Sequence, residues 1–411
     1  MATSESTNLE LRARALRAAG EFLRQGDLVD ELTRLIHQQT GKPWAWAQGE
    51  VQFCLSSWDA MIDEALDALT PQVIVREAET SRVEYRARGH VVIFSPFNSS
   101  LECVQLGLIS ALMAGNRVSV KLSPDADLAA SRWLSEIREA SDLPLEWVKG
   151  DAQAGMELLD RGFDMLVFTG SERVGRELAR RAAEHLVPCV LELGGKDLLI
   201  VRADADLAAA AEFAVENAFG YCGQSCTASE QILVDERVAE AWLKHFRDRL
   251  GARVDYGVYR GSVSRLESLV TEALDAGAQI AAGSAHWPML LDVTDVAIDA
   301  PLRVFNEEIF APLACLRRFS DDAEIFEWSA RLGFGLGAVI FTCASGLAVG
   351  DFDCDRLPHA MIGVNSACVG VQGTPWLGRG RSGLGQLGGA DGHRQFAIPQ
   401  VITSRPVAQR D

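Results

Sequence analysis

The sequence of 411 residues lacks several patterns that mark special classes of protein. It has no repeat of fixed period and no low-complexity tract, and 48% apolar with 23% charged residues is an ordinary globular composition. This composition excludes wholesale disorder, a collagen helix and a coiled-coil rod. The longest uncharged run, residues 332–350, is too rich in glycine for a membrane helix. The length predicts two or three domains of about 150 residues each.

Positive charge is also scarce. Lys and Arg total 39 against 57 Asp and Glu, which gives a net charge of -18. Because such a field repels phosphates, neither nucleic acid nor an anionic membrane is expected as a partner.

Cysteine pairs with metal-binding spacing are absent as well. The nine cysteines are scattered, form no CxxC pair and have no histidine cluster beside the closest two, Cys222 and Cys226. We therefore expect reduced thiols and no bound metal. The start of the chain has no basic-then-apolar leader, so the expected location is cytoplasmic.

Hydrophobic periodicity predicts an α/β protein. Residues 9–38 and 47–69 carry apolar side chains at helical spacing, and from residue 83 onward short apolar strands alternate with amphipathic helices. This order predicts a parallel sheet in which ligands bind beyond the carboxyl ends of the strands. A second series follows Gly194 and Gly195, which we interpret as the hinge between two lobes. The expected strands are 83–88, 90–94, 117–122, 145–148, 164–168, 189–193, 198–201 and 231–235, with others near Leu313, Ala338 and Ile362.

One strand-to-helix junction is a candidate phosphate site. Residues 168–175 lie where a buried strand turns into a helix, and the free backbone N–H groups of a helix start suit a pyrophosphate. The spacing is not GxGxxG, so the general dinucleotide fingerprint is absent. Taken alone, such a junction is more often structural than ligand-binding.

Three residues around the hinge carry groups suited to catalysis. Cys226 follows a helix and is a candidate nucleophile, although a packing thiol is the alternative. Glu192 ends an apolar strand, where burial would raise its pKa and suit a general base, but a structural carboxylate explains it equally well. Asn98 follows another strand and would donate to an oxyanion or, alternatively, form an Asx turn. Because all three residues lie around one hinge, together they indicate a catalytic site more strongly than each does alone.

These residues lie in motifs that resemble the aldehyde dehydrogenase superfamily over nearly the whole chain. The segments, in the order of the family, are TGKP (40–43), SPFN (95–98), AGNRVSVKLSP (114–124), FTGSERVG (168–175), ELGGKD (192–197), GQSC (223–226), NEEIFAP (306–312) and PWLGRGRSGLG (375–385). The resemblance implies an NAD(P)-dependent enzyme that oxidises a small-molecule aldehyde to a carboxylic acid.

The resemblance also implies a role for each matching residue. Cys226 matches the nucleophile, Glu192 the base that activates water, and Asn98 a donor of the oxyanion hole. Lys121 matches the lysine on the adenosine ribose, Ser171 the pyrophosphate site, and Glu308 and Phe310 the nicotinamide site. The other cofactor-binding positions that it implies are Ser123, Gly150, Thr169, Gly170, Gly175 and Leu193.

The fold implied by the resemblance has three parts. Residues 1–80 and 89–193 would form a Rossmann-like domain that binds NAD or NADP, and residues 194–392 an α/β catalytic domain. Residues 81–88 and 393–411 would form a small β flap for oligomerisation, so a homodimer or homotetramer is expected.

The sequence departs from the family at several points. The acid expected after Lys121 is missing from Lys-Leu-Ser-Pro, which predicts relaxed coenzyme choice, with NADP favoured. The chain is shortened at its start and between Cys226 and Glu308, so a catalytically impaired protein with a binding or structural role is the alternative. A coenzyme-A-acylating enzyme is a further alternative, disfavoured because Glu192 is present. No Arg or Lys lies in the expected pocket segments (Phe97, Ser225, Thr227 and 368–374), which disfavours a dicarboxylic semialdehyde.

Overall fold

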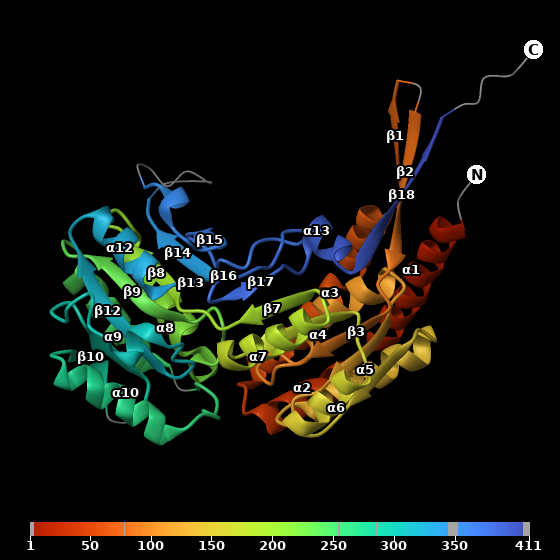
Figure 1. The fold of residues 1–411 in the computed structure, drawn as a ribbon. Coiled ribbons are helices and arrows are strands. Elements are labelled where there is room, and N and C mark those ends of the chain that lie inside the picture. Colours follow the sequence, from red (N-terminus) through yellow and green to blue (C-terminus); the bar gives the residue numbers. More distant parts are fainter. Residues whose placement is uncertain (1–3, 78, 254, 285–286, 344–351, 406–411) are drawn as a thin grey trace, which may run out of the picture.

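The computed structural model of the chain describes residues 4–77, 79–253, 255–284, 287–343 and 352–405. Two α/β lobes lie side by side, and three strands project from one lobe as a narrow arm (Figure 1). Each lobe is organised around a largely parallel sheet with helices packed on it, which confirms the predicted α/β class.

The first lobe is built on a six-stranded sheet with the order β17-β7-β6-β3-β4-β5. Its neighbours are parallel except β17, which runs antiparallel to β7 at one edge. β3 and β4 are rich in valine and almost fully buried, as is typical of parallel strands covered on both faces. The strands are β3 (His90–Phe94), β4 (Arg117–Lys121), β5 (Leu145–Val148), β6 (Met165–Gly170), β7 (Cys189–Leu193) and β17 (Gly383–Leu384).

Helices cover both faces of this sheet. In α1 the buried side chains of Leu9, Leu16 and Leu23 recur every seven residues, so one apolar stripe faces the core. Trp58 of α3 and Trp133 of α5 meet edge to face in this core, with 5.8 Å between ring centroids. The helices are α1 (Ser4–Leu23), α2 (Leu28–Thr40), α3 (Trp44–Leu69), α4 (Glu102–Met113), α5 (Asp127–Ser141), α6 (Ala152–Asp160), α7 (Glu172–Glu184) and α13 (Gly389–Arg394).

The strand order reverses beside β3. The chain runs from β3 to β4 and β5, and then continues with β6 and β7 on the other side of β3. α/β proteins bind ligands beyond the carboxyl ends of the strands at such a switch point. Asn98 follows β3 and Ser171 follows β6, so two of the predicted site residues lie at this position.

The second lobe contains a seven-stranded sheet with the order β10-β11-β12-β9-β8-β14-β15. Only the edge strand β10 is antiparallel to its neighbour. Its strands are β8 (Asp197–Val201), β9 (Ser229–Asp235), β10 (Gln279–Gly283), β11 (Met289–Asp292), β12 (Leu313–Phe319), β14 (Gly337–Phe341) and β15 (Met361–Val364). Its helices are α8 (Leu207–Phe219), α9 (Ala239–Ala252), α10 (Val263–Asp275), α11 (Arg303–Asn306) and α12 (Asp322–Leu332), with short 3-10 turns at Gly220–Gly223 and Cys354–Arg356.

The chain passes between the lobes at the predicted hinge and later returns. Gly194 and Gly195 connect β7 of the first sheet to β8 of the second. A short ribbon of β13 (Phe334–Gly335) and β16 (Arg379–Gly380) then leads to β17, which pairs with β7. Because α13 packs on α3, the chain is back at the first lobe before residue 392, where we expected the catalytic domain to end. The domain division itself stays a prediction.

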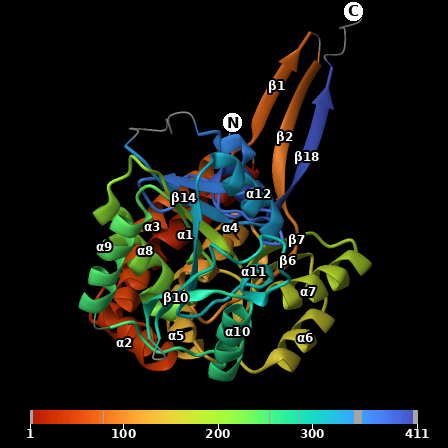
Figure 2. The same ribbon diagram turned by 90° about the vertical axis from the view of Figure 1, so that its left-hand side faces the viewer.

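The arm is a three-stranded antiparallel sheet of β1 (Gln72–Arg76), β2 (Glu79–Ala87) and β18 (Ala397–Ser404) (Figure 2). The expected flap segments 81–88 and 393–411 contribute β2 and β18, while 406–411 lie outside the described residues. β1 was not predicted as a strand. The exposed fractions of Val73, Val75 and Val401 are 64%, 58% and 62%, so apolar side chains lie open on the arm.

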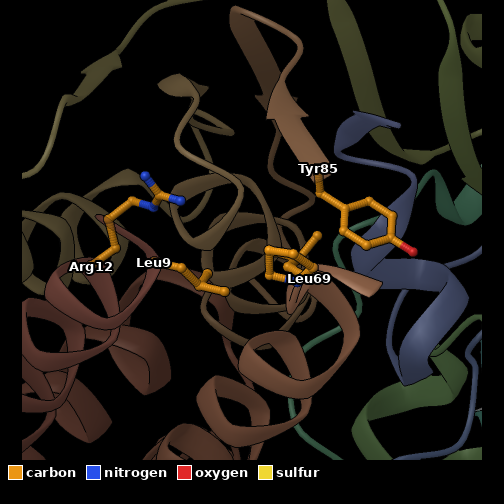
Figure 3. A pocket seen from close by; sticks show the side chains of 5 residues that line it. Leu9, Arg12, Leu69 and Tyr85 are labelled. Atoms are coloured by element: carbon orange, nitrogen blue, oxygen red, sulfur yellow. The ribbon is translucent and has the colours of Figure 1, made fainter. Parts of the chain in front are cut away.

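A small cavity lies at the base of the arm. Leu9, Arg12, Leu69, Pro71 and Tyr85 line it (Figure 3), and its volume of about 10 Å³ suffices for about one water molecule. It contains none of the predicted site residues. Among the described helices, none is long and apolar enough to cross a membrane.

Candidate active site

The loop that carries Cys226 has an unusual backbone. After α8 ends, Tyr221, Cys222 and Gly223 all take positive φ angles of 51°, 55° and 66°. A Cβ at Gly223 would lie 2.3 Å from the carbonyl oxygen of Ala311, so only glycine fits there. The Tyr221 hydroxyl donates to the carbonyl of Thr40 at 3.1 Å. This contact ties the loop to the TGKP segment of the first lobe.

Gln224 holds the same loop from the other side. Its Nε2 donates to the carbonyl of Val258 at 2.9 Å, and its Oε1 accepts from the backbone N–H of Arg260 at 2.8 Å. Cys222 does not face Cys226, because its Sγ donates to the carbonyl of Gly257 at 3.5 Å. Cys222 therefore has the contact of a packing thiol.

Cys226 lies at the centre of the candidate site. Packing of protein around its thiol raises its pKa well above the ordinary value, and the neighbouring carboxylates of Asp197, Glu308 and Glu192 add to the shift. A Cβ at Gly195 would lie 2.1 Å from the carbonyl oxygen of Cys226, so the hinge approaches the cysteine backbone as only glycine can. The thiol is therefore neutral at rest, and the site must deprotonate it for attack.

Glu192 lies near the end of β7 (Cys189–Leu193), close enough to Cys226 to raise the pKa of its thiol. Its side chain is buried, and neither carboxylate oxygen accepts a hydrogen bond from any of the described residues. Burial raises its pKa well above the ordinary value; the indole of Trp376 opposes this shift to a smaller extent, although its geometry falls short of a hydrogen bond. A buried carboxylate without partners can take up a proton, as a general base must.

Asn98 connects the two lobes at this point. Its Nδ2 donates to the carbonyl oxygen of Gln224 at 3.1 Å, in the loop before Cys226. The structure therefore places Asn98 against the loop two residues before Cys226. An amide nitrogen carries two N–H donors, so one stays available for an oxyanion beside the thiol.

Lys121 organises the outer part of the first lobe. Its Nζ donates to the carbonyls of Leu122 and Gly150 at 2.7 and 2.6 Å, and burial lowers its pKa. Gly150 has a φ of 112°, and Ser123 follows Leu122. Lys121, Ser123 and Gly150 thus gather beyond the carboxyl ends of β4 and β5.

The FTGSERVG segment forms the predicted strand-to-helix junction. β6 ends with Thr169 and Gly170, Ser171 is the N-cap, and α7 begins at Glu172. Thr169 pairs in register with Glu192 across the parallel strands β6 and β7. A Cβ at Gly175 would lie 2.3 Å from Cδ2 of Leu193, so this glycine lets α7 pack closely on the end of β7.

Glu308 and Phe310 approach the hinge from the second lobe. A Cβ at Gly194 would lie 2.1 Å from Oε2 of Glu308, which places this carboxylate directly over the hinge backbone. Burial raises the pKa of Glu308 to about 8, and nearby Glu230 adds to the shift. The ring of Phe310 meets Phe97 of the first lobe edge to face, with 6.1 Å between centroids.

Similarity to known proteins shows the family of this chain. A model described as "Aldehyde dehydrogenase family" matches residues 2–402. The chain belongs to this family. It is an NAD(P)-dependent oxidoreductase that acts on aldehydes.

Two curated relatives illustrate the sequence similarity of this aldehyde dehydrogenase. The 4,4'-diapolycopene aldehyde oxidase of Methylomonas sp is 33% identical over 340 residues, which cover 78% of this chain and 63% of the relative. The chain thus spans less than two thirds of that relative. The succinate semialdehyde dehydrogenase [NAD(P)+] Sad of Escherichia coli is 26% identical, with 96% and 89% covered.

Solved structures of aldehyde dehydrogenases share the fold. The NAD-dependent aldehyde dehydrogenase from Sinorhizobium meliloti is 26% identical and has a TM-score of 0.87, covering 99% of this chain and 84% of that one. The NADP-dependent glyceraldehyde-3-phosphate dehydrogenase from Bacillus halodurans C-125, in complex with NADP, is 27% identical with a TM-score of 0.87, covering 97% and 87%.

Several residues of the aldehyde dehydrogenase site were not singled out from the sequence. Lys196, Glu230 and Arg265 surround the segment that carries Glu308 and Phe310. Lys196 lies within ELGGKD, whereas Glu230 and Arg265 belong to no motif that we identified. The only signal for Glu230 was its place directly before the expected strand at 231–235, a position that the structure includes in β9 (Ser229–Asp235) and where an unpaired buried charge would be costly.

The residues present fit a dinucleotide. The start of α7 supplies backbone N–H groups without intrahelical partners, and the carboxylate of Glu308 lies against the hinge backbone at Gly194. Lys121 provides a cation at the outer end of the same sheet edge. The start of α7 suits the pyrophosphate, the hinge suits the nicotinamide end, and Lys121 suits the adenosine ribose.

Proposed function

We propose that this aldehyde dehydrogenase converts its aldehyde to a free carboxylic acid, with Cys226 as nucleophile, Glu192 as general base and Asn98 as oxyanion donor. The observation that carries the proposal is the buried carboxylate of Glu192, without hydrogen-bond partners among the described residues, near the half-buried thiol of Cys226. Such a carboxylate has no structural contact to maintain, and its raised pKa suits proton transfer near neutral pH.

In the first step the thiolate of Cys226 forms a carbon–sulfur bond with the aldehyde carbon. The carbonyl oxygen becomes an oxyanion, which the free N–H of Asn98 and the backbone N–H of Cys226 stabilise. Since the thiol is neutral at rest, its proton must leave to solvent before attack, and the carboxylate of Glu192 is kept for the second step.

In the second step the enzyme releases the product. NAD or NADP, held at its nicotinamide end by Glu308 and Phe310, would supply the acceptor for the hydride of the aldehyde carbon, and Cys226 would then carry the acyl group as a thioester. Glu192 then takes a proton from a water molecule that attacks the thioester carbon, and the carbon–sulfur bond breaks to return the thiolate and the acid. This role for Glu192 argues against release by coenzyme A.

The cofactor would lie along the carboxyl edge of the first sheet. Lys121, Ser123 and Gly150 would hold the adenosine ribose, and Thr169, Gly170, Ser171, Gly175 and Leu193 would surround the pyrophosphate and the turn beside it. Glu308 and Phe310 would hold the nicotinamide ribose and ring. The missing acid after Lys121 supports NADP as the preferred coenzyme, and the NADP complex of the Bacillus halodurans enzyme is compatible with that preference.

The charges around Cys226 support an aldehyde without a second carboxylate. The neighbours that affect its thiol electrostatically are all acidic: Asp197, Glu308, Glu192 and Glu102. None of them is a cation that could pair with a second carboxylate of the substrate. We therefore propose a neutral aldehyde, although the similar E. coli protein is named a succinate semialdehyde dehydrogenase.

The proposal includes a homo-oligomeric assembly and a cytoplasmic location. The exposed valines of the arm and its two open strand edges support a homodimer or homotetramer formed through residues 81–88 and 393–411. The division into a cofactor domain (1–80 and 89–193) and a catalytic domain (194–392) is part of the proposal, although β17 within the second range pairs with β7 of the first sheet. All nine cysteines are free thiols, which is compatible with the reducing cytoplasm.

A panel of neutral and dicarboxylic aldehydes, monitored by NADH and NADPH absorbance and by product analysis, tests the function. Wild-type protein is expected to produce free acid, and Cys226→Ala none. Acyl-coenzyme A without free acid would show the acylating alternative to be right. Cofactor binding without turnover of any aldehyde would support the binding protein.

A further inference from the structure

The segment 307–310 is held by an unusually complete set of bonds to its backbone. Lys196 Nζ donates to the carbonyl of Glu307 at 2.6 Å. Arg265 donates to the carbonyls of Glu308 and Ile309 at 2.8 and 2.9 Å. These contacts fix three successive carbonyls of the segment that carries two predicted cofactor residues.

Glu230 holds the amide side of the same segment. Its Oε1 accepts from the backbone N–H groups of Ile309 and Phe310 at 2.7 and 2.8 Å, and its Oε2 accepts from Lys196 Nζ at 2.7 Å. Lys196 is fully buried and Glu230 is 3% exposed. Both oxygens of the carboxylate are therefore used, and each faces only donors.

The conformation that these bonds enforce is one that the chain does not adopt readily. Phe310 has a φ of 48°, in the left-handed region that disfavours a residue with a Cβ. Its N–H is one of the two that Glu230 accepts, and its ring is the one that meets Phe97. Strained residues persist where the surroundings over-determine them, as they do at functional sites.

We propose that Glu230 is a positioning residue for the redox step, which holds Glu308 and Phe310 in place for the nicotinamide end of the cofactor through the backbone of 307–310. Lys196 and Arg265 complete the clamp. This inference rests on the proposed roles of Glu308 and Phe310. Glu230 itself contacts neither the cysteine nor the hinge in the hydrogen bonds that the described residues make, so it acts through the segment.

Glu230→Gln is the sharpest variant. Glutamine keeps the shape of the side chain, but either orientation of its amide points an N–H group at a donor, because the native carboxylate accepts at both oxygens. The matched control is Asp322→Asn, which removes the ion pair of Asp322 with Arg202 (2.8 Å) in the same lobe. Lys196 precedes β8 and Arg202 follows it, so the control lies at the opposite end of the same strand.

The readouts separate positioning from general loss of structure. Each variant is compared with wild type for kcat, for KM of NAD(P) and of the aldehyde, and for the isotope effect with aldehyde deuterated at the reacting carbon. The rate at which iodoacetamide labels Cys226 reports on the rest of the site. Circular dichroism shows whether each variant is folded.

We expect Glu230→Gln to lower kcat/KM for NAD(P) by about tenfold to a hundredfold and to increase the isotope effect, because misplacement by about 1 Å has such an effect on rate. The thiol labelling rate and Asp322→Asn are expected to match wild type. Wild-type kinetics for a folded Glu230→Gln overturn the inference, as does an equal loss in the control.

A second variant covers the case in which Glu230→Gln is unfolded. Arg265→Met removes the hydrogen bonds to the carbonyls of Glu308 and Ile309, and the side chain of Arg265 is partly exposed. We expect this variant to show the same fall in kcat/KM and the same larger isotope effect. Wild-type kinetics of Arg265→Met would overturn the inference too. If the wild type oxidises no aldehyde, the proposed function is wrong, but the inference about Glu230 can still be tested. Binding of NADH, measured by its fluorescence, then tests the clamp separately: Glu230→Gln is expected to weaken it, and unchanged binding overturns the inference.

Discussion

Asn98 Nδ2 donates a hydrogen bond to the carbonyl oxygen of Gln224 at 3.1 Å, from the loop after β3 to the loop that carries Cys226. This bond fixes the orientation of the amide before a substrate binds. It also joins the switch point of the first sheet to the loop of the proposed nucleophile in the second lobe. Preorganised donors of this kind are the largest contributors to acyl-transfer catalysis.

Removal of the Asn98 amide is expected to slow catalysis. Asn98→Ala should reduce kcat by about 10²- to 10³-fold, because the oxyanion loses a donor that is already in place. Steady-state NAD(P) reduction measures the loss. Asn98→Asp is the shape-matched control and should be at least as impaired, since it has no N–H to donate. Turnover by Asn98→Asp close to that of wild type would contradict the oxyanion role.

Glu192→Gln is expected to separate the two halves of the reaction. The thioester would form but hydrolyse slowly, so a burst of about one NAD(P)H per active site should remain while steady turnover falls by about 10²- to 10⁴-fold. In wild type, deacylation should accelerate as the pH rises through the raised pKa of Glu192. Stopped-flow absorbance between pH 6 and 9 checks both. A variant that loses burst and steady state together would show that Glu192 is needed at an earlier step.

The stability of the cofactor-free protein is expected to depend on Glu308. Its pKa of about 8 lies above the ordinary 4.5, so this group stabilises the fold below about pH 4.5, and the contribution is lost as the pH rises through about 8. Glu308→Gln stays neutral at every pH and escapes this loss. The difference in Tm, variant minus wild type, should therefore grow by about 2 °C or more between pH 5 and pH 8. Thermal melts at a fixed scan rate measure it, and a constant difference would refute the raised pKa.

Lys121 is expected to affect the two coenzymes unequally. Lys121→Met removes the cation at the proposed ribose position, so kcat/KM should fall about tenfold to a hundredfold with NADP and less with NAD, because only NADP carries a 2'-phosphate. Initial rates of wild type and Lys121→Met, measured with NAD and with NADP, test this prediction. A wild-type preference for NAD of about a hundredfold would contradict the proposed preference for NADP.

The arm is expected to carry the oligomer interface. Val401→Lys places a charge among its exposed apolar side chains and should shift the protein toward a monomer of 44.6 kDa. Light scattering after gel filtration measures the mass. Val263→Lys, at an exposed valine at the start of α10, is the control and should leave the mass unchanged. The same mass for both variants and wild type would show that the oligomer interface does not include this part of the arm.

Local signals were sufficient for much of the fold. The strands at 90–94, 145–148 and 189–193 begin and end where they were expected, because continuous apolar runs bounded by turn residues define buried parallel strands. β1, with exposed side chains throughout, and the antiparallel strands β10 and β11 were not predicted. The side chains of β1 show no alternation between exposed and buried, and β10 and β11 are defined by their pairing with each other and with β12.

The sequence by itself determined the family, the two α/β series, the hinge at Gly194 and Gly195, and the motif residues Cys226, Glu192 and Asn98. Each of these features depends on residues that are neighbours in the chain, such as the end of a strand, a pair of glycines or a motif of four to eleven residues. Only the tertiary structure decided which groups meet. Glu230 and Phe310 are 80 residues apart, and their hydrogen bond exists because β9 and the segment before β12 converge in space. The burial that raises the pKa of Glu192 likewise comes from packing, which no local pattern records.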